Sequence, residues 1–536
     1  MAESKTRAAA KSRTVFGVLS GTGIAVLAGA VVAAGSLFPG AAAGKSLEAQ
    51  AAQLPAGQTI ANCVGPAQLL QASADGTDPQ FSAASTSAKN EISALVLSND
   101  KSVLPNSVLS SLKADSTTAP LAKISSQPSS VPSATPGAAP SLGKAAALQA
   151  KSTNSPSVLR VDPVNDQRTP ASAVQLFSAS DGDLRGLAGS SCQSPSNDAW
   201  LLGASTEVGR TAVLNLSNSS STPATVNLDL YGSAGQIQNP GAKGLLVAPG
   251  TNRAIVLAGL APGQKELAVH LRSTGGAVSA VIQQSVLRGL TPGGVENLGT
   301  VAAPNQHQVI PGVLTMAPSL ASQISSQSDY ADAQTTLQVA VPGAADTVVQ
   351  VKVYGQSGPA ALPNGGVFTA KAGAVSELAL SGLPAGAYTV ELSADAQITA
   401  SVRSVRGSKT GEPVDLASSA AATKLADNQL ITLPAGVASR LVFTAPSGKA
   451  KLSLTPVQQD GTLQAAKSLD LNGGTTVLLD PTQLAGAGVV GFLVSASGDA
   501  AYGSQLINQK GGNGLTMLAI PRSVVNQSSV PISLGY

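Results

Sequence analysis

The sequence contains few of the residue types that carry out chemistry. Charged residues make up 11% of the 536 positions and aromatic residues 3%, while histidine and cysteine each occur twice and tryptophan once. A chain with so few charges lacks the basic patch that nucleic-acid binding requires, so we exclude nucleic acid as a partner. The sequence also contains no phosphate-binding loop, EF-hand loop or HExxH pattern. We therefore expect neither a metal nor another cofactor.

Two histidines offer little scope for acid–base catalysis. His270 alternates with the apolar residues of the run 267–271, so its side chain points to the opposite, solvated face. His307 ends a polar stretch, 304–307, that is typical of a loop between repeated units. Because no GxSxG elbow accompanies a base histidine, we predict no catalytic residue and no enzymatic activity.

The scarcity of aromatic residues also argues against a glycoside hydrolase, because sugar sites are commonly lined by aromatic platforms. Trp200 precedes two leucines, which favours a place in the core over sugar stacking. Tyr231 and Tyr354 take the same outward position in two repeated strands. We expect them to pack over the turn that follows each strand, and the alternative is a repeated ligand surface.

What the sequence does have is a short basic tail followed by a long uncharged run. Lysine and arginine occur four times in residues 1–14, and residues 15–38 carry no charge. The rest of the chain is formally neutral, with 28 basic and 28 acidic residues after residue 14. The net charge of +3 therefore lies in the tail, on the side of the run that the positive-inside rule places in the cytoplasm.

The uncharged run is long enough to be a membrane anchor. As a helix rising about 1.5 Å per residue, the 24 residues of 15–38 would just span a hydrocarbon core of roughly 30 Å. A cleaved signal has a shorter apolar region of about 7–15 residues, so the length favours a transmembrane helix or uncleaved signal anchor. The small residues Ala41 to Ala43 favour the alternative, secretion after cleavage near Ala43. We predict a single-pass cell-membrane protein whose N-terminus is cytoplasmic and whose bulk is extracellular.

Cys63 and Cys192 both follow the uncharged run and would therefore lie outside the cell. An even number of cysteines in an oxidising compartment favours a disulfide between them over two unrelated buried thiols. In the chain-entropy model, closing a loop of this length stabilises the fold by roughly 4–5 kcal/mol.

The chain after the anchor divides by composition. Residues 44–106 form an N-terminal extracytoplasmic piece with one convincing strand candidate, 92–97. Residues 107–165 are rich in Ser, Ala and Pro, which is typical of a flexible low-complexity linker or stalk. If the two cysteines pair, the early piece must fold back on the region after the linker, which then becomes a surface excursion.

From about residue 210 onward the sequence repeats itself. VNLDLYGSAG at 226–235 and VQVKVYGQSG at 349–358 show the same two-residue alternation, 123 residues apart. The offset keeps glycines in step over about fifty residues, so we interpret the two stretches as copies of one unit. A looser third copy begins near Leu441, and in it Pro456 replaces an inward residue, which suggests an edge strand or a bulge.

Each unit contains about six or seven alternating runs, separated by turn pairs such as Pro249-Gly250. This strand number predicts immunoglobulin-like antiparallel β-sandwiches. The expected units are residues 190–300, 310–410 and 425–536. The predicted fold is therefore all-β, with tandem sandwich modules after an N-terminal transmembrane helix and a disordered segment rich in Ser, Ala and Pro.

The stretch from Cys192 through Trp200 and Gly209 into LNLSN and VNLDLYG resembles a family of secreted or membrane-anchored actinobacterial proteins of unknown function. An early cysteine in the setting CVGP, residues 63–66, fits the same pattern. The resemblance covers most of the chain after the anchor and implies an envelope location and β-rich modules. It implies no catalytic residues, because the family has no established activity.

Together these features predict a non-enzymatic, membrane-anchored extracytoplasmic protein with a structural or interaction role at the cell envelope. Its partner would be the membrane, through residues 15–38, and an envelope protein or a glycan. The alternative is a glycan-binding accessory protein in cell-wall or surface-polysaccharide assembly. That alternative requires Tyr231, Tyr354 or Trp200 to be exposed in a shallow groove.

Overall fold

The computed structural model describes two bodies of the chain. The described residues are 51–53, 56–70, 85–113, 118–127, 143–165, 167–363, 365–522 and 529–531. The larger body comprises residues 55–527, and the smaller one comprises 1–54 and 528–536. In the smaller body, β1 (Ala51–Gln53) pairs antiparallel with β36 (Ser529–Pro531).

The basic tail 1–14 and the predicted transmembrane helix 15–38 lie outside the described residues, as does the predicted cleavage site near Ala43. Among the residues that are described, no helix combines the length and the apolar character needed to cross a membrane. The described helices are short, namely η1 (Pro240–Ala242), η2 (Leu257–Gly259), α2 (Pro318–Ser325) and α3 (Pro481–Ala485). The anchor and its cleavage stay predictions.

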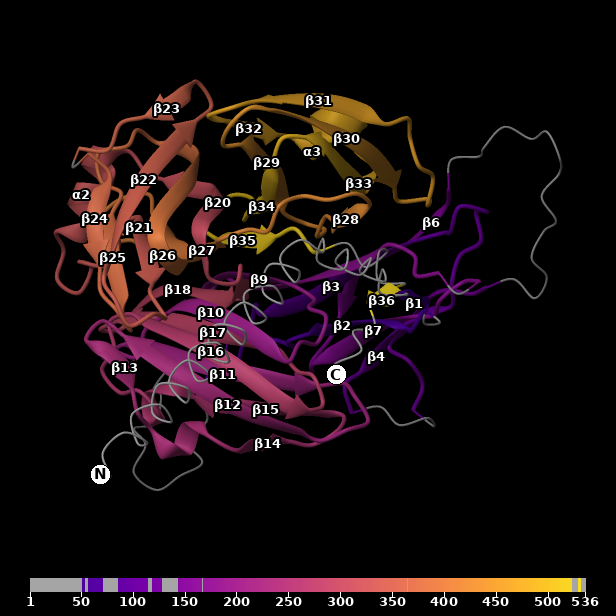
Figure 1. Ribbon diagram of the computed structural model, residues 1–536, viewed down its shortest axis with the longest axis horizontal. Coiled ribbons are helices and arrows are strands. Elements are labelled where there is room, and N and C mark those ends of the chain that lie inside the picture. The colour runs from indigo at the N-terminus through magenta and orange to yellow at the C-terminus, as the bar shows by residue number, and fades with distance from the viewer. Residues whose placement is uncertain are drawn as a thin grey trace, which may run out of the picture. The chain divides into compact units, whose positions relative to one another are not determined.

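The larger body is all-β and consists of four modules (Figure 1), each made of two antiparallel sheets around an apolar core of its own. We name them module 1 (residues 55–193), module 2 (194–301), module 3 (302–422) and module 4 (423–522). When the strand positions are numbered in chain order, one sheet of every module has the order 1-6-3-4 and the other 5-2-7-8. The chain therefore repeats one unit four times.

The strands of module 1 are β2 (Thr59–Cys63), β3 (Lys89–Leu97), β4 (Ser107–Ser111), β5 (Ala122–Ser125), β6 (Ala145–Ser152), β7 (Ser157–Val161), β8 (Ala171–Ala179) and β9 (Gly186–Ser191). Those of module 2 are β10 (Asp198–Ala204), β11 (Arg210–Asn218), β12 (Ala224–Gly232), β13 (Gly235–Ile237), β14 (Leu245–Val247), β15 (Thr251–Val256), β16 (Leu267–Gly275), β17 (Ser279–Arg288), β18 (Thr291–Leu298) and β19 (Thr300–Val301).

The strands of module 3 are β20 (Asn305–Thr315), β21 (Thr336–Ala340), β22 (Thr347–Gly355), β23 (Gly358–Ala360), β24 (Val367–Ala370), β25 (Val375–Ala379), β26 (Gly386–Arg406) and β27 (Asp415–Ala420). Those of module 4 are β28 (Gln429–Thr432), β29 (Ala438–Ala445), β30 (Lys449–Gln458), β31 (Lys467–Asn472), β32 (Thr475–Leu479), β33 (Val489–Gly498), β34 (Tyr502–Asn508) and β35 (Leu515–Ala519). Two short strands share position four in modules 2 and 3, and β26 runs through positions six and seven of module 3.

The alternating pattern of β12 explains how the two sheets of module 2 pack. Val226, Leu228 and Leu230 point inward and meet Leu214 and Leu216 of β11 in the facing sheet. Each such side chain contributes about 1.5–3 kcal/mol when it is removed from water. The inward valines of β22 repeat this packing in module 3, so the offset found in the sequence relates strands that hold the same place in two modules.

Pro456 lies in β30, near the end of its pairing with β31. The pairing with β31 extends only as far as Leu454, so the missing N–H of the proline costs no hydrogen bond to that strand. The register of β30 against β33 then shifts between Val457 and Gln458. This irregularity, one residue beyond the proline, agrees with the predicted bulge.

The predicted linker at 107–165 is wrong for its described residues, while residues 114–117 and 128–142 of it lie outside the described part of the chain. Its described residues contain β4, β5, β6 and β7, which complete both sheets of module 1. Leu109 and Leu159 from these strands are fully buried in the core. Serine and alanine fill most other positions, so each strand carries few large apolar residues and the composition mimics a linker. The described strands β2 and β3 of the predicted piece 44–106 belong to the same two sheets, so they are not part of a separate unit.

The four modules form a closed circuit of contacts. Their eighth strands, β9, β18, β27 and β35, touch one another in chain order, and β35 returns to β9. Figure 1 shows these strands meeting between the modules. Module 4 also packs Leu430 and Val490 against Leu95 of module 1, and Thr432 Oγ1 donates to the main-chain oxygen of Ser172 at 3.1 Å.

Candidate functional site

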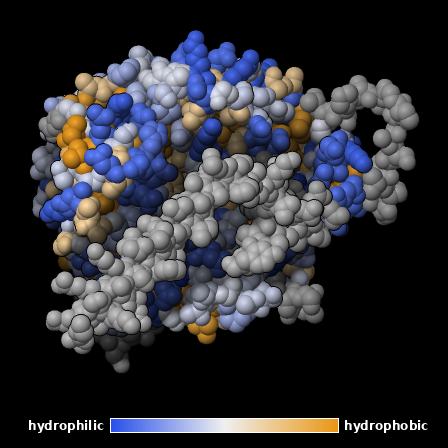
Figure 2. All heavy atoms as spheres, in the orientation of Figure 1, coloured by the Kyte–Doolittle hydropathy of each residue, from blue (hydrophilic) through white to orange (hydrophobic). Residues whose placement is uncertain are grey.

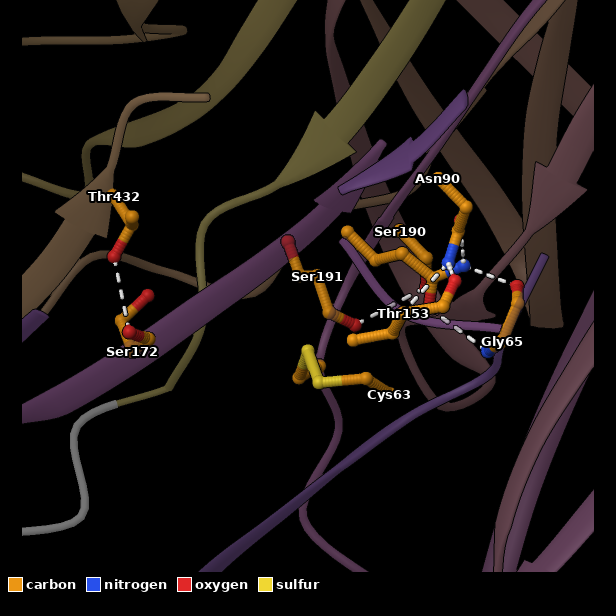
Figure 3. Close-up of a disulfide and its surroundings, with 10 residues drawn as sticks. Cys63, Gly65, Asn90, Thr153, Ser172, Ser190, Ser191 and Thr432 are labelled. Atoms are coloured by element: carbon orange, nitrogen blue, oxygen red, sulfur yellow. Dashed lines mark hydrogen bonds between the residues drawn. A yellow bond between two sulfur atoms is a disulfide. The ribbon is translucent and has the colours of Figure 1, made fainter. Parts of the chain in front are cut away.

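The two cysteines form a disulfide, as predicted (Figure 3). Cys63 ends β2 and Cys192 follows β9, so the bond joins the first and last strands of module 1. Next to it, the main chains of Asn62 and Gln193 exchange two hydrogen bonds of 2.8 and 2.9 Å. The disulfide therefore closes module 1 where the chain leaves for module 2.

A buried amide network holds the turn after the first cysteine (Figure 3). Gln175 Oε1 accepts from the Gly65 N–H at 2.9 Å, and Gln175 Nε2 donates to Asn90 Oδ1 at 2.8 Å. Asn90 Nδ2 in turn donates to the main chain and hydroxyl of Thr153. Gly65 has φ 96°, and a Cβ there would lie 2.9 Å from the nitrogen of Pro156. The CVGP motif needs its glycine for both reasons.

Trp200 lies on the outward face of module 2 and not in that module's own core. Its ring stacks on His270 of β16, with centroids 4.2 Å apart, and on Tyr231 of β12 at 5.6 Å. Trp200 and His270 are direct cross-strand neighbours, so the sheet itself positions the two rings. The cluster packs against Ala340 and Val375 of module 3. Trp200 is therefore buried, as expected, but between two modules and not in the core of one.

Carboxylates hold His270 in place. Its Nε2 lies 3.1 Å from Asp198 Oδ2, and its Nδ1 lies 3.7 Å from Asp229 Oδ2. Burial raises the pKa of Asp229, but hydrogen bonds from Lys243 and Arg272 outweigh it and the net pKa is lowered. His270 thus lies on the outward sheet face, as the alternation predicts, but its side chain is only 16% exposed, so the predicted solvated position is wrong.

Tyr354 occupies the corresponding place in module 3 and faces module 4. Its hydroxyl donates to Glu391, whose other carboxylate oxygen lies 2.7 Å from His307 Nε2. The main-chain oxygen of Tyr354 accepts from Thr476 Oγ1 of module 4 at 2.7 Å. Burial and the bond to Glu391 raise the pKa of Tyr354, so its phenol stays protonated. The predicted loop at His307 is wrong, because this residue lies inside β20.

The three aromatic candidates are 6%, 7% and 6% exposed for Trp200, Tyr231 and Tyr354, respectively. These rings therefore do not line an exposed groove, which the alternative of a repeated ligand surface requires. The expected packing of Tyr231 and Tyr354 over the turns that follow them describes only part of their surroundings. Both tyrosines pack against the next module, because the outward face of one module is covered by its neighbour.

A second group of charged side chains joins module 2 to module 3. Asp332 accepts from Arg210 at 2.8 Å and from Arg288 at 2.9 Å. The Arg288 guanidinium also lies over the ring of Tyr330, 4.7 Å from its centroid. Burial lowers the pKa of Arg288, and the charge of Asp332 opposes that effect.

Glu266 and Glu377 lie beside this group. Glu266 accepts from Gln338, and its Oε1 is 3.4 Å from an Arg403 nitrogen. Burial raises the pKa of Glu266 well above its usual range, although the charge of Arg403 opposes this. The pKa of Glu377 is lowered, because its hydrogen bonds to Glu266 and Lys265 outweigh the effect of burial. The pKa values of the two carboxyl groups are therefore shifted in opposite directions.

The space between these groups is a cavity of about 30 Å³. A pocket for a small organic ligand is roughly ten times larger, about 300–1,000 Å³, whereas a water needs only about 10–15 Å³. Arg403 Nε and Glu377 Oε1 are buried and have no hydrogen-bond partner among the described residues. Arg403 lines this cavity, so a water there would accept from its Nε, whereas Glu377 does not line it and its Oε1 lies 3.6 Å from another Arg403 nitrogen. The cluster thus supports the contact between modules.

Asp415, the first residue of β27, lies at the meeting point of the four eighth strands. Its Oδ2 accepts from the N–H groups of Leu187 and Leu515, both at 2.9 Å. Its Oδ1 accepts from the N–H groups of Leu416 at 3.0 Å and Val295 at 3.2 Å. Burial raises the pKa of Asp415 to about 7, although all four hydrogen bonds act in the opposite direction.

Glu296 of β18 adds a second buried carboxyl group here. Its Oε1 accepts from Thr516 Oγ1 at 2.7 Å and from the Asn297 N–H at 2.8 Å. Burial, with a smaller effect from the charge of Asp415, raises the pKa of Glu296 well above its usual range.

Neither Asp415, Glu296 nor Glu266 was a candidate from the sequence. Each is one acidic residue among 29, and an isolated carboxylate in an alternating strand looks like a solvated surface residue. One signal was present for Asp415. It lies in the eighth strand of module 3, where the equivalent residues of modules 1 and 2 are Gly186 and Gly294.

None of the curated proteins or solved structures compared with the chain matches it. A family model, described as a family of unknown function (DUF5719), matches residues 147–482. The matched range begins in β6 of module 1 and ends in α3 of module 4, so it takes in modules 2 and 3 whole and parts of the other two. It includes Cys192 and the repeated strands on which the resemblance rested. Because the match covers more than half of the chain, the protein belongs to the family DUF5719, whose function is unknown.

Proposed function

We propose that this protein is a non-enzymatic, membrane-anchored extracytoplasmic protein that displays its four modules as one rigid body, with a structural or interaction role at the cell envelope. Residues 15–38 would hold it in the membrane, and cleavage near Ala43 is the alternative. The observation that carries the proposal is the disulfide between Cys63 and Cys192. Such bonds persist in oxidising compartments and are rare in the cytosol.

The use of the polar and aromatic side chains supports a non-enzymatic role. Trp200 and Tyr231 pack against module 3, and Tyr354 binds module 4. The charged residues around Glu266 enclose a cavity with room for water but not for a substrate. These side chains stabilise the circuit of modules. Because the glycan-binding alternative requires exposed rings, the structure gives it no support.

We also propose that each module is a modified immunoglobulin-like sandwich. In the immunoglobulin constant domain, strand two neighbours strand five and strand three neighbours strand six, as they do here. There the first strand pairs with the second and the seventh with the sixth, whereas here the first pairs with the sixth and the seventh with the second. The first and seventh strands have thus exchanged sheets, strand four pairs with strand three instead of strand five, and an eighth strand is added, while the two central ladders are shared.

The location is tested by protease accessibility. A protease site and an epitope tag placed after Tyr536 should be cut on intact cells, while an epitope placed within the tail 1–14 stays protected until lysis. A C-terminal tag that is cut only in lysed cells would refute the proposed location. The intact mass of the protein from membrane and medium fractions then distinguishes a retained anchor from cleavage near Ala43.

A further inference from the structure

The carboxylate of Asp415 binds one main-chain N–H from each of the four modules. The donors are Leu187 in module 1, Val295 in module 2, Leu416 in its own module and Leu515 in module 4. Each carboxylate oxygen accepts two of them, at 2.9–3.2 Å, which uses the four lone-pair sites that a carboxylate has. Because the donors belong to the eighth strand of each module, the donor set is a product of the fourfold repeat.

Glycine precedes three of the four donors, and two of these glycines leave room for this carboxylate. The residues just before the donors are Gly186, Gly294 and Gly514 in modules 1, 2 and 4, and Asp415 itself in module 3. A Cβ at Gly186 would lie 2.6 Å from Asp415 Oδ1, and a Cβ at Gly294 would collide with the same oxygen. A second aspartate in the set would also bring two buried carboxylates together, which strongly disfavours ionising both. Modules 1 and 2 therefore supply space that Asp415 of module 3 fills, whereas a Cβ at Gly514 would meet Gln509 and Leu187 instead.

We propose that the four N–H groups of residues 187, 295, 416 and 515 form a carboxylate-binding site, that the chain fills this site with its own Asp415, and that filling it holds the circuit of modules closed. Converging main-chain N–H groups are a general means of binding anions. Without an acceptor they become four buried, unpaired donors, which is costly. An emptied site takes a small monocarboxylate, and acetate has the heavy atoms of the missing side chain.

Asp415→Gly in the full chain tests this proposal, because it removes the side chain and makes all four positions glycine. At pH 8 we expect its Tm to lie below that of the wild type and to rise with acetate concentration beyond the rise in chloride of equal ionic strength. Once the site is half filled, each further tenfold increase in acetate should add a similar increment of stability. The wild-type protein, whose site is already filled, should respond equally to acetate and chloride.

Asp460→Gly is the matched control. The carboxylate of Asp460 accepts from the N–H and the hydroxyl of Thr462 at 2.9 and 2.7 Å, but it is exposed and binds only within its own turn. Acetate should not stabilise this variant more than chloride does. An acetate response in Asp415→Gly no larger than that of this control would overturn the proposal.

Asp415→Asn covers the case in which the glycine variant fails to fold. Asparagine keeps the volume, but its NH₂ group would face two N–H donors and cannot accept from them. Amide hydrogen exchange followed by mass spectrometry should show faster exchange in peptides containing residues 187, 295, 416 and 515, by about tenfold or more relative to the rest of each sandwich. Unchanged exchange at these residues would show that the carboxylate does not hold the modules together.

Discussion

At the residue scale, a chain with few charges places several of its carboxyl groups in contacts between modules. Burial raises the pKa of Asp415, Glu296 and Glu266. A carboxyl group with a higher pKa in the folded state binds its proton more tightly when folded. Its contribution to stability is therefore complete below the unfolded pKa, near 4, and is lost as the pH rises through the folded pKa.

We therefore expect the protein to lose stability on going from about pH 4 to pH 7. Asp415, with its pKa raised to about 7, should lower the free energy of unfolding by up to about 1.4 kcal/mol per pH unit in this range. Urea unfolding at a series of pH values measures this slope. Glu296→Gln replaces a buried carboxyl by an uncharged isostere and should flatten the slope. Glu207→Gln, at an exposed position, is the control and should leave the slope unchanged. Equal slopes in the two variants would show that the buried carboxyl group of Glu296 does not contribute to the pH dependence.

The two tyrosines of the repeat provide a matched pair. Tyr354→Phe removes the hydroxyl that donates to the buried carboxylate of Glu391, so we expect a loss of about 1–3 kcal/mol in the free energy of unfolding. Tyr231→Phe should cost less, because no hydrogen bond of the Tyr231 hydroxyl is found among the described residues. Denaturant titrations of both variants give the comparison. A Tyr231→Phe loss as large as that of Tyr354→Phe would mean that packing, and not the hydrogen bond, dominates.

At the scale of elements, the strand order places the disulfide between the first and last strands of module 1. The bond joins two cysteines that are 129 residues apart in sequence. The loop that it closes contains nearly the whole module, so the bond constrains the unfolded state of this region strongly. Module 1 also has the smallest of the four module cores among the described residues. The covalent bond compensates for a smaller core.

Removing the disulfide should therefore destabilise the protein markedly. Replacing Cys63 and Cys192 together by serine is expected to lower the free energy of unfolding by about 4–5 kcal/mol, less any relief of strain. Urea titrations with and without a reductant measure the effect. Reductant should shift the wild type towards the double variant and leave the variant unchanged. A wild type that is insensitive to complete reduction would show that module 1 does not depend on the bond.

The strands themselves were predictable where the alternation was strong. In β12 and β22, Val or Leu fills every inward position, so the period of two is clear and the repeat could be aligned. In β4 and β6, serine and alanine hide that period, and the same residues were interpreted as a linker. These strands form because β2, β3, β7 and β8, distant in sequence, supply their partners and the apolar surface beneath them.

At the scale of the whole larger body, closure of the circuit couples the four modules. Each shares a contact with its neighbours, and the eighth strands of all four meet at Asp415. The view in Figure 2 shows hydrophilic side chains over much of the exterior, whereas the aromatic residues that face outward from single sheets are buried between modules. A module separated from this circuit would expose those rings to water.

We therefore expect the modules to unfold together. Differential scanning calorimetry should give one transition whose calorimetric and van't Hoff enthalpies agree, instead of several transitions as in independent tandem domains. Asp415→Gly without acetate should broaden or split this transition, because it removes the carboxylate that binds all four modules. Several separate transitions in the wild type would show that the contacts between modules contribute little to stability.

The sequence by itself determined the β class, the repeated unit, the family and, since the chain has only two cysteines, the disulfide partners. Alternation, turn residues and cysteine number are properties of short stretches, and they can be detected without knowing which stretches meet. Only the tertiary structure decided that residues 55–193 are a fourth copy, that Trp200, Tyr231 and Tyr354 are covered by neighbouring modules, and that Asp415 binds all four. Those features depend on contacts between residues about a hundred or more positions apart, which no local pattern records.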